Sequence, residues 1–484
     1  MARKIKVLTD TEGVDRREVG YYSTPSFVAK YLTEELLELN PSGNYVLDPA
    51  TGKEELLPFF FDAGKKIDSY DIIDYNSHKY SRFHCKDFIE HYIDRLAYLP
   101  FEQEIYDYII ANPPYNCHEV AYIRDNKKRL SEAFPIGAYN MYSMFLSAII
   151  NMAKDGCLIG VIISDSFLTA TLHAKLREEI FTKCSIHQLI LCPNDLFWNQ
   201  NADVRTCIMI LQKGVQYQKQ VKILNRPSDV NEFKHILNQK DFKSVSLDSI
   251  RLGIDRAVNQ FIVDINSDVV DLFKKLPSLG SIFKCVTCIS TGNDKKYLSK
   301  TSMPGFSVPF YKNPARRKFI SEPDAYLIDD YLEESTKVKD FMVRNKTFLT
   351  NEGIVCSSMG LPFSAAYKPQ NSVSGVNPTI FPNQKDIYWL MAYLNSSLVT
   401  YLVRGVLIRS NMVTSGYVCR IPLLNLTIMD KKLLEDICIK TLQKKINVLD
   451  AIYDIDNIVF KVSKLSNISI SKIQYFVNNL GKTV

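Results

Sequence analysis

Short apolar runs alternate with amphipathic stretches between residues 20 and 225, and this alternation constrains the fold more than any other feature. The amphipathic stretches have helical spacing, with Thr24 and Pro25 in the pattern of an N-cap and first helical residue, and they are Pro25–Leu39, Met141–Ala153 and Leu172–Lys183. The apolar runs have the pattern of buried strands, and they are Tyr45–Leu47, Ile67–Tyr70, Tyr106–Ile110, Cys157–Ser164, Ile186–Leu191 and Arg205–Leu211. Such alternation predicts an α/β fold with a doubly wound, mostly parallel sheet, in which ligands bind beyond the carboxyl ends of the strands.

The character of the chain changes after Gly214. Polar, lysine-rich stretches extend to about Lys243, short strands and turns follow to about Leu424, and the sequence becomes helical from Met429. A chain of 484 residues has room for two or three domains. We therefore predict an α/β domain over residues 1–225, an α+β domain over 226–428 and a helical C-terminal segment over 429–484.

Charge is distributed unevenly along the chain. Residues 1–200 carry 21 Lys and Arg against 28 Asp and Glu, whereas residues 201–484 carry 38 against 25. The net charge is therefore −7 in the first part and +13 in the second, although the whole chain has only +6. This asymmetry predicts that the later part of the chain contacts a polyanion.

The sequence favours an intracellular protein without a metal centre. The first ten residues lack an apolar signal region, and the longest apolar stretch, Tyr388–Ile408, is interrupted by polar residues, so we expect neither secretion nor a membrane span. Eleven scattered cysteines fit reduced thiols in the cytoplasm. The close pair Cys285 and Cys288 lacks a second pair or nearby histidines, which disfavours zinc.

The tetrapeptide Asn112, Pro113, Pro114, Tyr115 directly follows a predicted strand. Two prolines fix the backbone and remove two donors, so the turn presents carbonyl oxygens and the Asn112 amide oxygen. Such acceptors suit an –NH2 group, because accepting its hydrogens orients the nitrogen lone pair for attack on a methyl carbon. Tyr115 adds a ring on which a planar base can stack. A plain turn at a strand end is the alternative interpretation.

Acidic residues follow the two preceding predicted strands, and a third acid, Asp87, comes after Cys85 and Lys86. Asp48 begins the loop Asp48–Gly52, whose small residues allow a cofactor close to the backbone, and Asp71 ends the next strand where ribose hydroxyls are commonly bound. Asp87 with Phe88 offers an acceptor and an apolar plate for an adenine ring. Each acid alone is typical of a solvated loop, but the ordered set predicts one nucleotide-like site.

The chain resembles gamma-class N6-adenine DNA methyltransferases of the TaqI type. The resemblance is strong over residues 20–213, where the order of the motifs also matches, and weaker over Gly360–Thr379 and Asn395–Pro422. The matching residues are Gly20–Pro25, Val46–Gly52, Asp71, Asp87 with Phe88, Asn112–Tyr115, Tyr139–Tyr142 with Phe145, Gly156–Leu168, and Phe197 with Ala202–Leu211.

This resemblance implies a Rossmann-like methyltransferase domain that uses S-adenosylmethionine, followed by a target-recognition domain. Thr24 and Asp48 would lie near the methionine end of the cofactor, and Asp71 at its ribose. Asp87 and Phe88 would lie at its adenine ring. The other residues implied at the cofactor are Ala50, Gly52, Ile72, Asn112 and Phe145, the last as a wall of the adenosine pocket.

The resemblance also implies a target base. Asn112 and the Pro113 carbonyl would hold N6 of an adenine turned out of the duplex, with Tyr115 stacked on the ring and Phe197 touching it from another side. Stacking inside a duplex hides N6 from a rigid pocket, so this interpretation requires base flipping. No metal is expected, because the amine can lose its proton after the transfer.

Glu54 departs from the family pattern, in which a glycine usually stands at this place of the cofactor loop. Its side chain would either crowd the methionine part of the cofactor or pair with its ammonium group. We expect S-adenosylmethionine to bind weakly rather than not at all.

The basic part of the chain should hold double-stranded DNA. The candidate contacts are Lys312, Arg316, Arg317, Lys318, Arg344 and Arg409, for which phosphate contact is commoner than base reading. We expect a monomer. A separately encoded cognate restriction endonuclease remains open as a partner, as does a solitary regulatory role.

Several alternative functions have weaker support. Protein-glutamine methyltransferases share the tetrapeptide but lack such a basic tail, and N4-cytosine enzymes usually have Ser in place of Asn112. Type I modification subunits resemble chains with a long helical region before the core, whereas 19 residues precede Gly20 here. A degenerate core that only binds DNA is opposed by the intact motifs, and a fused nuclease by the lack of a suitable acidic constellation.

Overall fold

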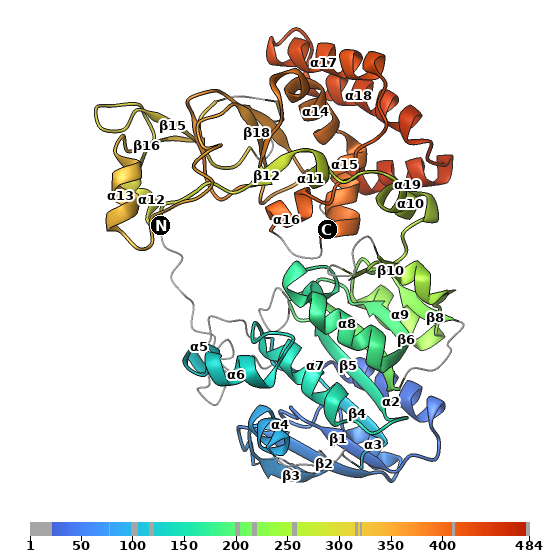
Figure 1. Cartoon of the computed structure of the whole chain (residues 1–484). Helices are drawn as coiled ribbons and strands as arrows, with labels where there is room; N and C mark the ends of the chain where they lie inside the picture. Colours follow the sequence, from blue (N-terminus) through green and yellow to red (C-terminus); the bar gives the residue numbers. More distant parts are fainter. Residues whose placement is uncertain are drawn as a thin grey trace. The chain divides into compact units, whose positions relative to one another are not determined.

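The computed structural model describes residues 22–76, 78–97, 105–115, 121–198, 204–214, 220–253, 259–314, 318–319, 322–408 and 412–480. Two compact units make up the chain, unit 1 from Met1 to Asp264 and unit 2 from Ile265 to Val484. Figure 1 shows the elements of both.

Unit 1 is built on one sheet of nine strands, as the predicted doubly wound α/β fold requires. From one edge to the other, the strands are β3 (Arg82–Cys85), β2 (Lys66–Asp71), β1 (Tyr45–Asp48), β4 (Tyr108–Ala111), β5 (Leu158–Ser164), β7 (Thr206–Lys213), β6 (Cys184–Leu191), β8 (Val221–Leu224) and β9 (Lys243–Val245). The first five are mutually parallel. β7 is antiparallel to both β5 and β6, β8 is parallel to β6, and β9 is antiparallel to β8.

Helices cover both faces of this sheet (Figure 1). The residues of β4 alternate, since Tyr108 and Ile110 pack into one core while Ile109 and Ala111 pack into the other. The first core is closed by α2 (Ser26–Leu39), α3 (Pro58–Asp62) and α9 (Val230–Gln239). The second is closed by α4 (Phe88–Leu96), α6 (Lys127–Ala133), α7 (Met141–Met152) and α8 (Ala174–Lys183), and α5 (Ala121–Asp125) precedes α6.

The start of α2 differs from the prediction. Pro25 is the N-cap residue and makes no side-chain capping bond, and the helix begins at Ser26. The expected cap, Thr24, uses its hydroxyl oxygen instead to accept a hydrogen bond from the Asn112 side chain. The capping prediction was wrong because a tertiary contact took the hydroxyl.

The end of unit 1 lies beyond the predicted boundary at residue 225. Residues 226–264 include α9 and β9, the 3₁₀ helix η4 (Leu247–Ile250) and the pair β10 (Arg251–Leu252) and β11 (Gln260–Phe261). The fully buried Arg177 of α8 holds this part, because its Nε donates to the Asn259 carbonyl and its Nη1 donates to the Phe167 and Ala170 carbonyls. Phe167 belongs to the short helix η1 (Asp165–Leu168), and Ala170 follows it. The next short helix, η2 (Thr171–His173), leads into α8.

Unit 2 begins with short strands arranged in several small sheets. One contains β12 (Lys284–Val286), β21 (Thr379–Phe381), β18 (Gly353–Cys356) and β19 (Ala365–Lys368). Another contains β14 (Leu298–Ser299), β16 (Ala325–Leu327), β15 (Val308–Tyr311) and β20 (Val373–Ser374), and β13 (Ile289–Ser290) pairs with β17 (Met342–Val343). The accompanying helices are α10 (Ser267–Lys275), α11 (Leu279–Ile282), α12 (Asp294–Tyr297) and α13 (Tyr331–Lys337).

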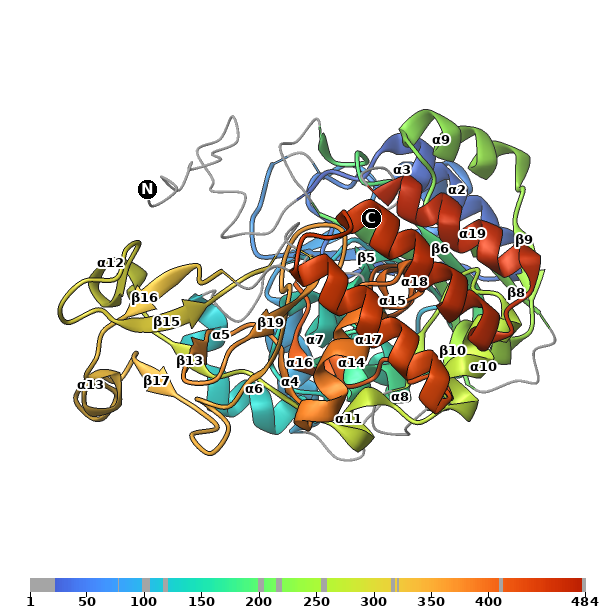
Figure 2. The ribbon, with the colours of Figure 1, turned by 90° about the horizontal axis from the view of Figure 1, so that it is seen from above.

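The rest of unit 2 is helical. It contains η6 (Gln384–Asp386), α14 (Ile387–Leu394), α15 (Ser397–Tyr401), the π-helix η7 (Leu402–Leu407), α16 (Ser415–Val418), α17 (Ile428–Leu442), α18 (Val448–Ser463) and α19 (Asn467–Asn478). Helices α17 and α18 lie side by side, α14 packs on α17, and α15 packs on α18 and α19 (Figure 2). The C-terminal helices therefore form one body with the segment before them, not a separate unit.

Among the described residues, no single helix is long and apolar enough to cross a membrane. One pair, 384–394 with 397–407, meets the criterion of length and composition only together, and it is bent by 68° at its break.

Candidate active site

Four side chains predicted for the site lie at one edge of the sheet in unit 1. Asp48 ends β1, Asp71 ends β2, Asp87 follows β3 and Asn112 follows β4. These strands are parallel neighbours in the order β3, β2, β1, β4, so their carboxyl ends share that edge. In the described part of the chain, no group of three or more His, Cys, Asp or Glu residues is arranged to hold a metal ion.

Asp48 is fully buried at the start of the cofactor loop. Its Oδ1 accepts a hydrogen bond from the Ala50 amide at 3.1 Å, whereas its Oδ2 has no hydrogen-bond partner among the residues that the structure describes. Burial raises the pKa of this carboxyl well above its ordinary value, and the nearby charges of Asp71 and Glu55 add to the rise. A cationic group placed beside Oδ2 would offset this cost, since a buried acceptor gains most from a charged donor.

Asp71 joins the cofactor loop to the loop after β2. Its Oδ2 accepts from the Gly52 amide at 2.8 Å, and its Oδ1 accepts from the Ile73 amide at 3.0 Å. Gly52 has φ +53°, a conformation that glycine adopts without steric cost. The neighbouring Ile72 is 59% exposed, so an apolar side chain stands in solvent beside a carboxylate.

Asp87 and Phe88 have clear structural roles at the start of α4. Asp87 caps the helix, with Oδ1 accepting from the Ile89 amide at 2.8 Å, and burial raises the pKa of its carboxyl. The Phe88 ring is stacked on Phe145 of α7, with centroids 5.7 Å apart and an interplanar angle of 26°. The structure thus places Phe145 against Phe88, the residue that follows Asp87.

The Asn112 amide is held in one orientation by a segment 90 residues earlier in the chain. Its Nδ2 donates to the Tyr22 carbonyl at 2.7 Å and to Thr24 Oγ1 at 2.9 Å. Both amide hydrogens are thereby used, and Oδ1 is left as the acceptor. Pro113 is buried and Pro114 half-buried in the turn that follows.

Tyr115 points its hydroxyl group inward. The hydroxyl donates to Asn112 Oδ1 and also lies 3.2 Å from the Ile162 carbonyl. Burial raises the pKa of this phenol well above its ordinary value, so it stays a neutral donor. An amine that binds Asn112 Oδ1 must therefore displace or share the bond from the Tyr115 hydroxyl.

Three aromatic rings gather beside this bond. Tyr22 is stacked on Tyr115, with centroids 5.6 Å apart and an interplanar angle of 16°. Phe197 lies 6.0 Å from Tyr22 and 6.4 Å from Tyr115, but it is fully buried, so it supports the two tyrosines instead of presenting an open face. Tyr22 was not predicted as a site residue, although it lies within the matching motif Gly20–Pro25. Trp198, next to Phe197, is 61% exposed.

The Glu54 side chain is buried against the segment between β2 and β3. Its side chain is 1% exposed, and its carboxylate accepts hydrogen bonds from Lys79, Tyr80 and Ser81, in the segment between β2 and β3.

A buried ion pair joins two further strand ends. Arg226 Nη2 pairs with Asp165 Oδ2 after β5, and Arg226 Nη1 donates to the Cys192 carbonyl after β6. Asp165 is 1% exposed. Sequence reasoning missed both residues, since Arg226 stands outside any motif and beyond the predicted domain boundary.

The predicted DNA contacts in unit 2 have different surroundings. Lys318 does not fit the prediction, because it is 8% exposed, its Nζ donates to the Asn395 carbonyl at 3.0 Å, and burial lowers its pKa to about 8. Lys312 is half-exposed and pairs with Asp294, and Arg344 is exposed. The predicted contacts that lie outside the described residues are Arg316, Arg317 and Arg409.

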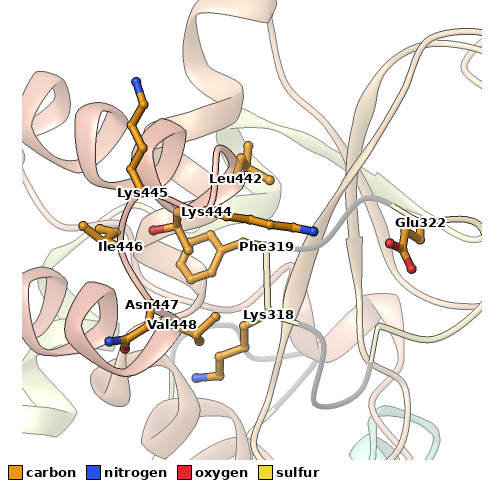
Figure 3. A pocket seen from close by; sticks show the side chains of 10 residues that line it. Lys318, Phe319, Glu322, Leu442, Lys444, Lys445, Ile446, Asn447 and Val448 are labelled. Atoms are coloured by element: carbon orange, nitrogen blue, oxygen red, sulfur yellow. The ribbon is translucent and has the colours of Figure 1, made fainter.

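Unit 2 contains a pocket of about 550 Å³ between the Lys318 segment and the α17–α18 connection. Its charged side chains do not converge, since Lys445 and Glu322 point away from the ring of Phe319 in different directions (Figure 3). The lining residues are Lys318, Phe319, Glu322, Thr441, Leu442, Lys444, Lys445, Ile446, Asn447 and Val448. None of the residues predicted for catalysis or cofactor binding lines it.

The sequence matches one family model and is similar to methyltransferases among known proteins. Residues 7–252, just over half of the chain, match the family model described as N-6 DNA Methylase. The chain is 31% identical over 112 residues to a putative type II restriction enzyme and methyltransferase of Methanocaldococcus jannaschii, covering 23% of this chain and 9% of that protein. It is 30% identical over 197 residues to the type II methyltransferase M.BanIII of Aneurinibacillus aneurinilyticus, covering 34% of each. The match thus spans about a third or less of each relative.

A solved structure is similar to this chain over nearly its full length. The type IIL restriction-modification enzyme MmeI, solved in complex with DNA, superposes with a TM-score of 0.61 over 98% of this chain and 80% of that one. The identity is 11%, so the likeness concerns the fold.

Proposed function

We propose a specific reaction for this chain, which belongs to the N-6 DNA methylase family: transfer of a methyl group from S-adenosylmethionine to N6 of an adenine in duplex DNA. The observation that carries the proposal is the Asn112 side chain, whose amide hydrogens are both held so that its oxygen is presented at the carboxyl end of β4. We also propose that the chain is a gamma-class enzyme and that it acts as the modification enzyme of a restriction-modification system.

The side chains at the sheet edge fit S-adenosylmethionine. The buried Asp48 Oδ2, which has no hydrogen-bond partner among the described residues, suits the ammonium of the methionine part. Thr24, Ala50 and Gly52 are the other residues proposed at this end of the cofactor. The Asp71 carboxylate suits the ribose hydroxyls, and the exposed Ile72 suits the adenine face. The residues proposed around the rest of the adenine are Asp87, Phe88 and Phe145. When bound, the cofactor supplies a methyl group on a sulfonium sulfur.

The residues of the tetrapeptide would orient the target amine. Asn112 Oδ1 and the Pro113 carbonyl accept its two hydrogens, which directs the nitrogen lone pair along the line of methyl transfer. The N–C bond forms as the S–C bond breaks, and the amine then loses its proton to solvent. Tyr115 gives up its hydrogen bond to Asn112 and stacks on the base, and Phe197 supports the tyrosine rings from within the core. The base must leave the duplex to reach this place.

Unit 2 would bind the duplex through its excess of Lys and Arg. We propose that the protein acts as a monomer, with a separately encoded restriction endonuclease as its cognate. Because Lys and Arg neutralise phosphates and release counterions, DNA affinity should fall about a thousandfold between about 50 and about 200 mM salt if roughly six phosphates are contacted. Fluorescence anisotropy of a labelled duplex over a salt series measures this. A flat dependence would show that the positive charge faces another partner.

Methyl transfer tests the proposed reaction directly. The protein is incubated with duplex DNA and S-adenosylmethionine carrying a labelled methyl group, and the DNA is digested to nucleosides. We expect the label in N6-methyladenine. Label in N4-methylcytosine would assign the chain to the other exocyclic-amine reaction, and DNA binding without any label would make it a binding protein with a degenerate core.

A further inference from the structure

Glu54 stands in a backbone conformation that L-amino acids rarely adopt. Its φ is +63°, in the left-handed region, and the members of the family that the chain resembles usually have glycine there. A side chain at such a place strains the backbone, so its presence calls for a compensating contact.

The compensating contacts are hydrogen bonds to the segment between β2 and β3. Glu54 Oε2 accepts from the Lys79 amide at 2.5 Å and from the Tyr80 amide at 3.1 Å, and Oε1 accepts from Ser81 Oγ at 2.6 Å. Ser81 Oγ lies in turn 2.5 Å from Ser69 Oγ of β2. Three donors on a carboxylate that is 1% exposed satisfy it inside the protein.

Imidazole packing completes this side of the loop. His78 Nδ1 lies 3.9 Å from Glu54 Oε1, and the His78 ring is stacked on Phe83 of β3 with centroids 3.5 Å apart. The segment from Asp71 to Ser81 is therefore held at both ends. At its start Asp71 accepts from the Gly52 amide, and at its end Glu54 binds Lys79, Tyr80 and Ser81.

We propose that Glu54 is a positioning residue, which holds residues 79–81 against the loop that carries it and so keeps Asp71 and Ile72 in place for the ribose and adenine of the cofactor. This rests on the proposed function, because it assigns Asp71 and Ile72 to S-adenosylmethionine. Glu54 does not touch the cofactor, and its effect reaches the ligand through the segment that it holds. A loop ordered before binding need not be ordered by the ligand, which increases affinity.

Replacement by glycine separates the hydrogen bonds from the backbone strain. Glu54→Gly removes the three bonds while φ +63° becomes easy, whereas Glu54→Gln keeps an acceptor for the two amides and a donor for Ser81 Oγ. Ser81→Ala removes one of the three bonds to Glu54, together with the contact to Ser69 Oγ, and leaves the loop that carries Glu54 unchanged. Lys79→Ala is the matched control, because the exposed Lys79 takes part through its backbone amide, which alanine retains.

Calorimetry with S-adenosylmethionine should show Kd raised about fivefold to tenfold in Glu54→Gly, about twofold in Ser81→Ala and less than about twofold in Glu54→Gln and Lys79→Ala. In methyl transfer, KM for the cofactor should rise with Kd while kcat changes less than about twofold. Hydrogen exchange at the Lys79 and Tyr80 amides should be faster in Glu54→Gly alone.

Equal or tighter cofactor binding by Glu54→Gly would overturn the proposal and show that the side chain only crowds the site. Unchanged exchange at Lys79 and Tyr80 would overturn it as well, whatever the protein binds. A wild-type protein that binds no S-adenosylmethionine would refute the proposed function itself. If the wild type binds the cofactor and Glu54→Gly binds it equally well, only the role of Glu54 is refuted.

Discussion

Replacing Asn112 by alanine should lower kcat for DNA methylation about a thousandfold, which is the effect of removing a group that acts on the reacting atom in the transition state. The amide oxygen is the acceptor that the structure presents at the end of β4, and its orientation depends on bonds from Nδ2 to the Tyr22 carbonyl and Thr24 Oγ1. Duplex binding should change less than about threefold, since no phosphate contact is lost. Steady-state methyl transfer and anisotropy with the same duplex measure the two quantities.

Two variants separate the acceptor from its support. Asn112→Asp keeps an oxygen at the acceptor position but loses both donors, and we expect an intermediate loss of about a hundredfold because the oxygen is no longer held. Thr24→Ala removes only one of the two supports and should cost about tenfold or less. Activity of Asn112→Ala within tenfold of the wild type would refute the role of Asn112 as the amine acceptor.

Replacing Arg226 by alanine should lower the free energy of unfolding of unit 1 by about 3 to 5 kcal/mol. The guanidinium pairs with Asp165, which is 1% exposed, and also donates to the Cys192 carbonyl. Alanine would leave a buried carboxylate without that cation, which costs more than the pair itself contributes. Urea unfolding, followed by far-ultraviolet circular dichroism, gives the change in free energy from the midpoint and slope.

The double variant Asp165→Asn with Arg226→Ala tests the cause. Removing the negative charge as well should recover about half of the loss, because an amide is cheaper to bury than a carboxylate. Lys222→Ala is a control in the same region. Its partner Glu35 is buried but keeps its ion pair with Lys240, so the change should cost about 1 kcal/mol or less. A loss for Arg226→Ala as small as that of the control would show that the ion pair contributes little.

The central fold followed from local patterns. Apolar runs in β1, β4, β5, β6 and β7 were predicted within a few residues, because strands buried on both faces leave continuous apolar sequence. β2 was also predicted, although only two of its residues are buried. β3 was missed, since its residues Arg82, Phe83, His84 and Cys85 are all partly or fully exposed. The antiparallel insertion of β7 between β5 and β6 was also missed, because pairing direction depends on chain connections that a strand's own sequence does not record.

The candidate site was predicted in its positions but not in its contacts. Strand-end residues such as Asp48 and Asn112 follow from chain order, since parallel strands bring their ends together. The bonds from Asn112 to Thr24 and from Glu54 to Lys79 join segments 88 and 25 residues apart, and no local pattern indicates them. Lys318 was predicted to contact DNA but is buried, because a basic cluster in the sequence gives no information about which of its members is buried.

The Arg226 ion pair and the edge strands β8 and β9 bear on how the chain can be dissected. A cut after residue 225 would remove Arg226, the covering helix α9 and the edge strand β9 from unit 1. It would leave β8 as an unpaired edge strand that is prone to aggregation. A cut after Asp264 keeps these parts together. Chimeras that exchange unit 2 between related chains should therefore be joined near residue 264, where each unit keeps its own core.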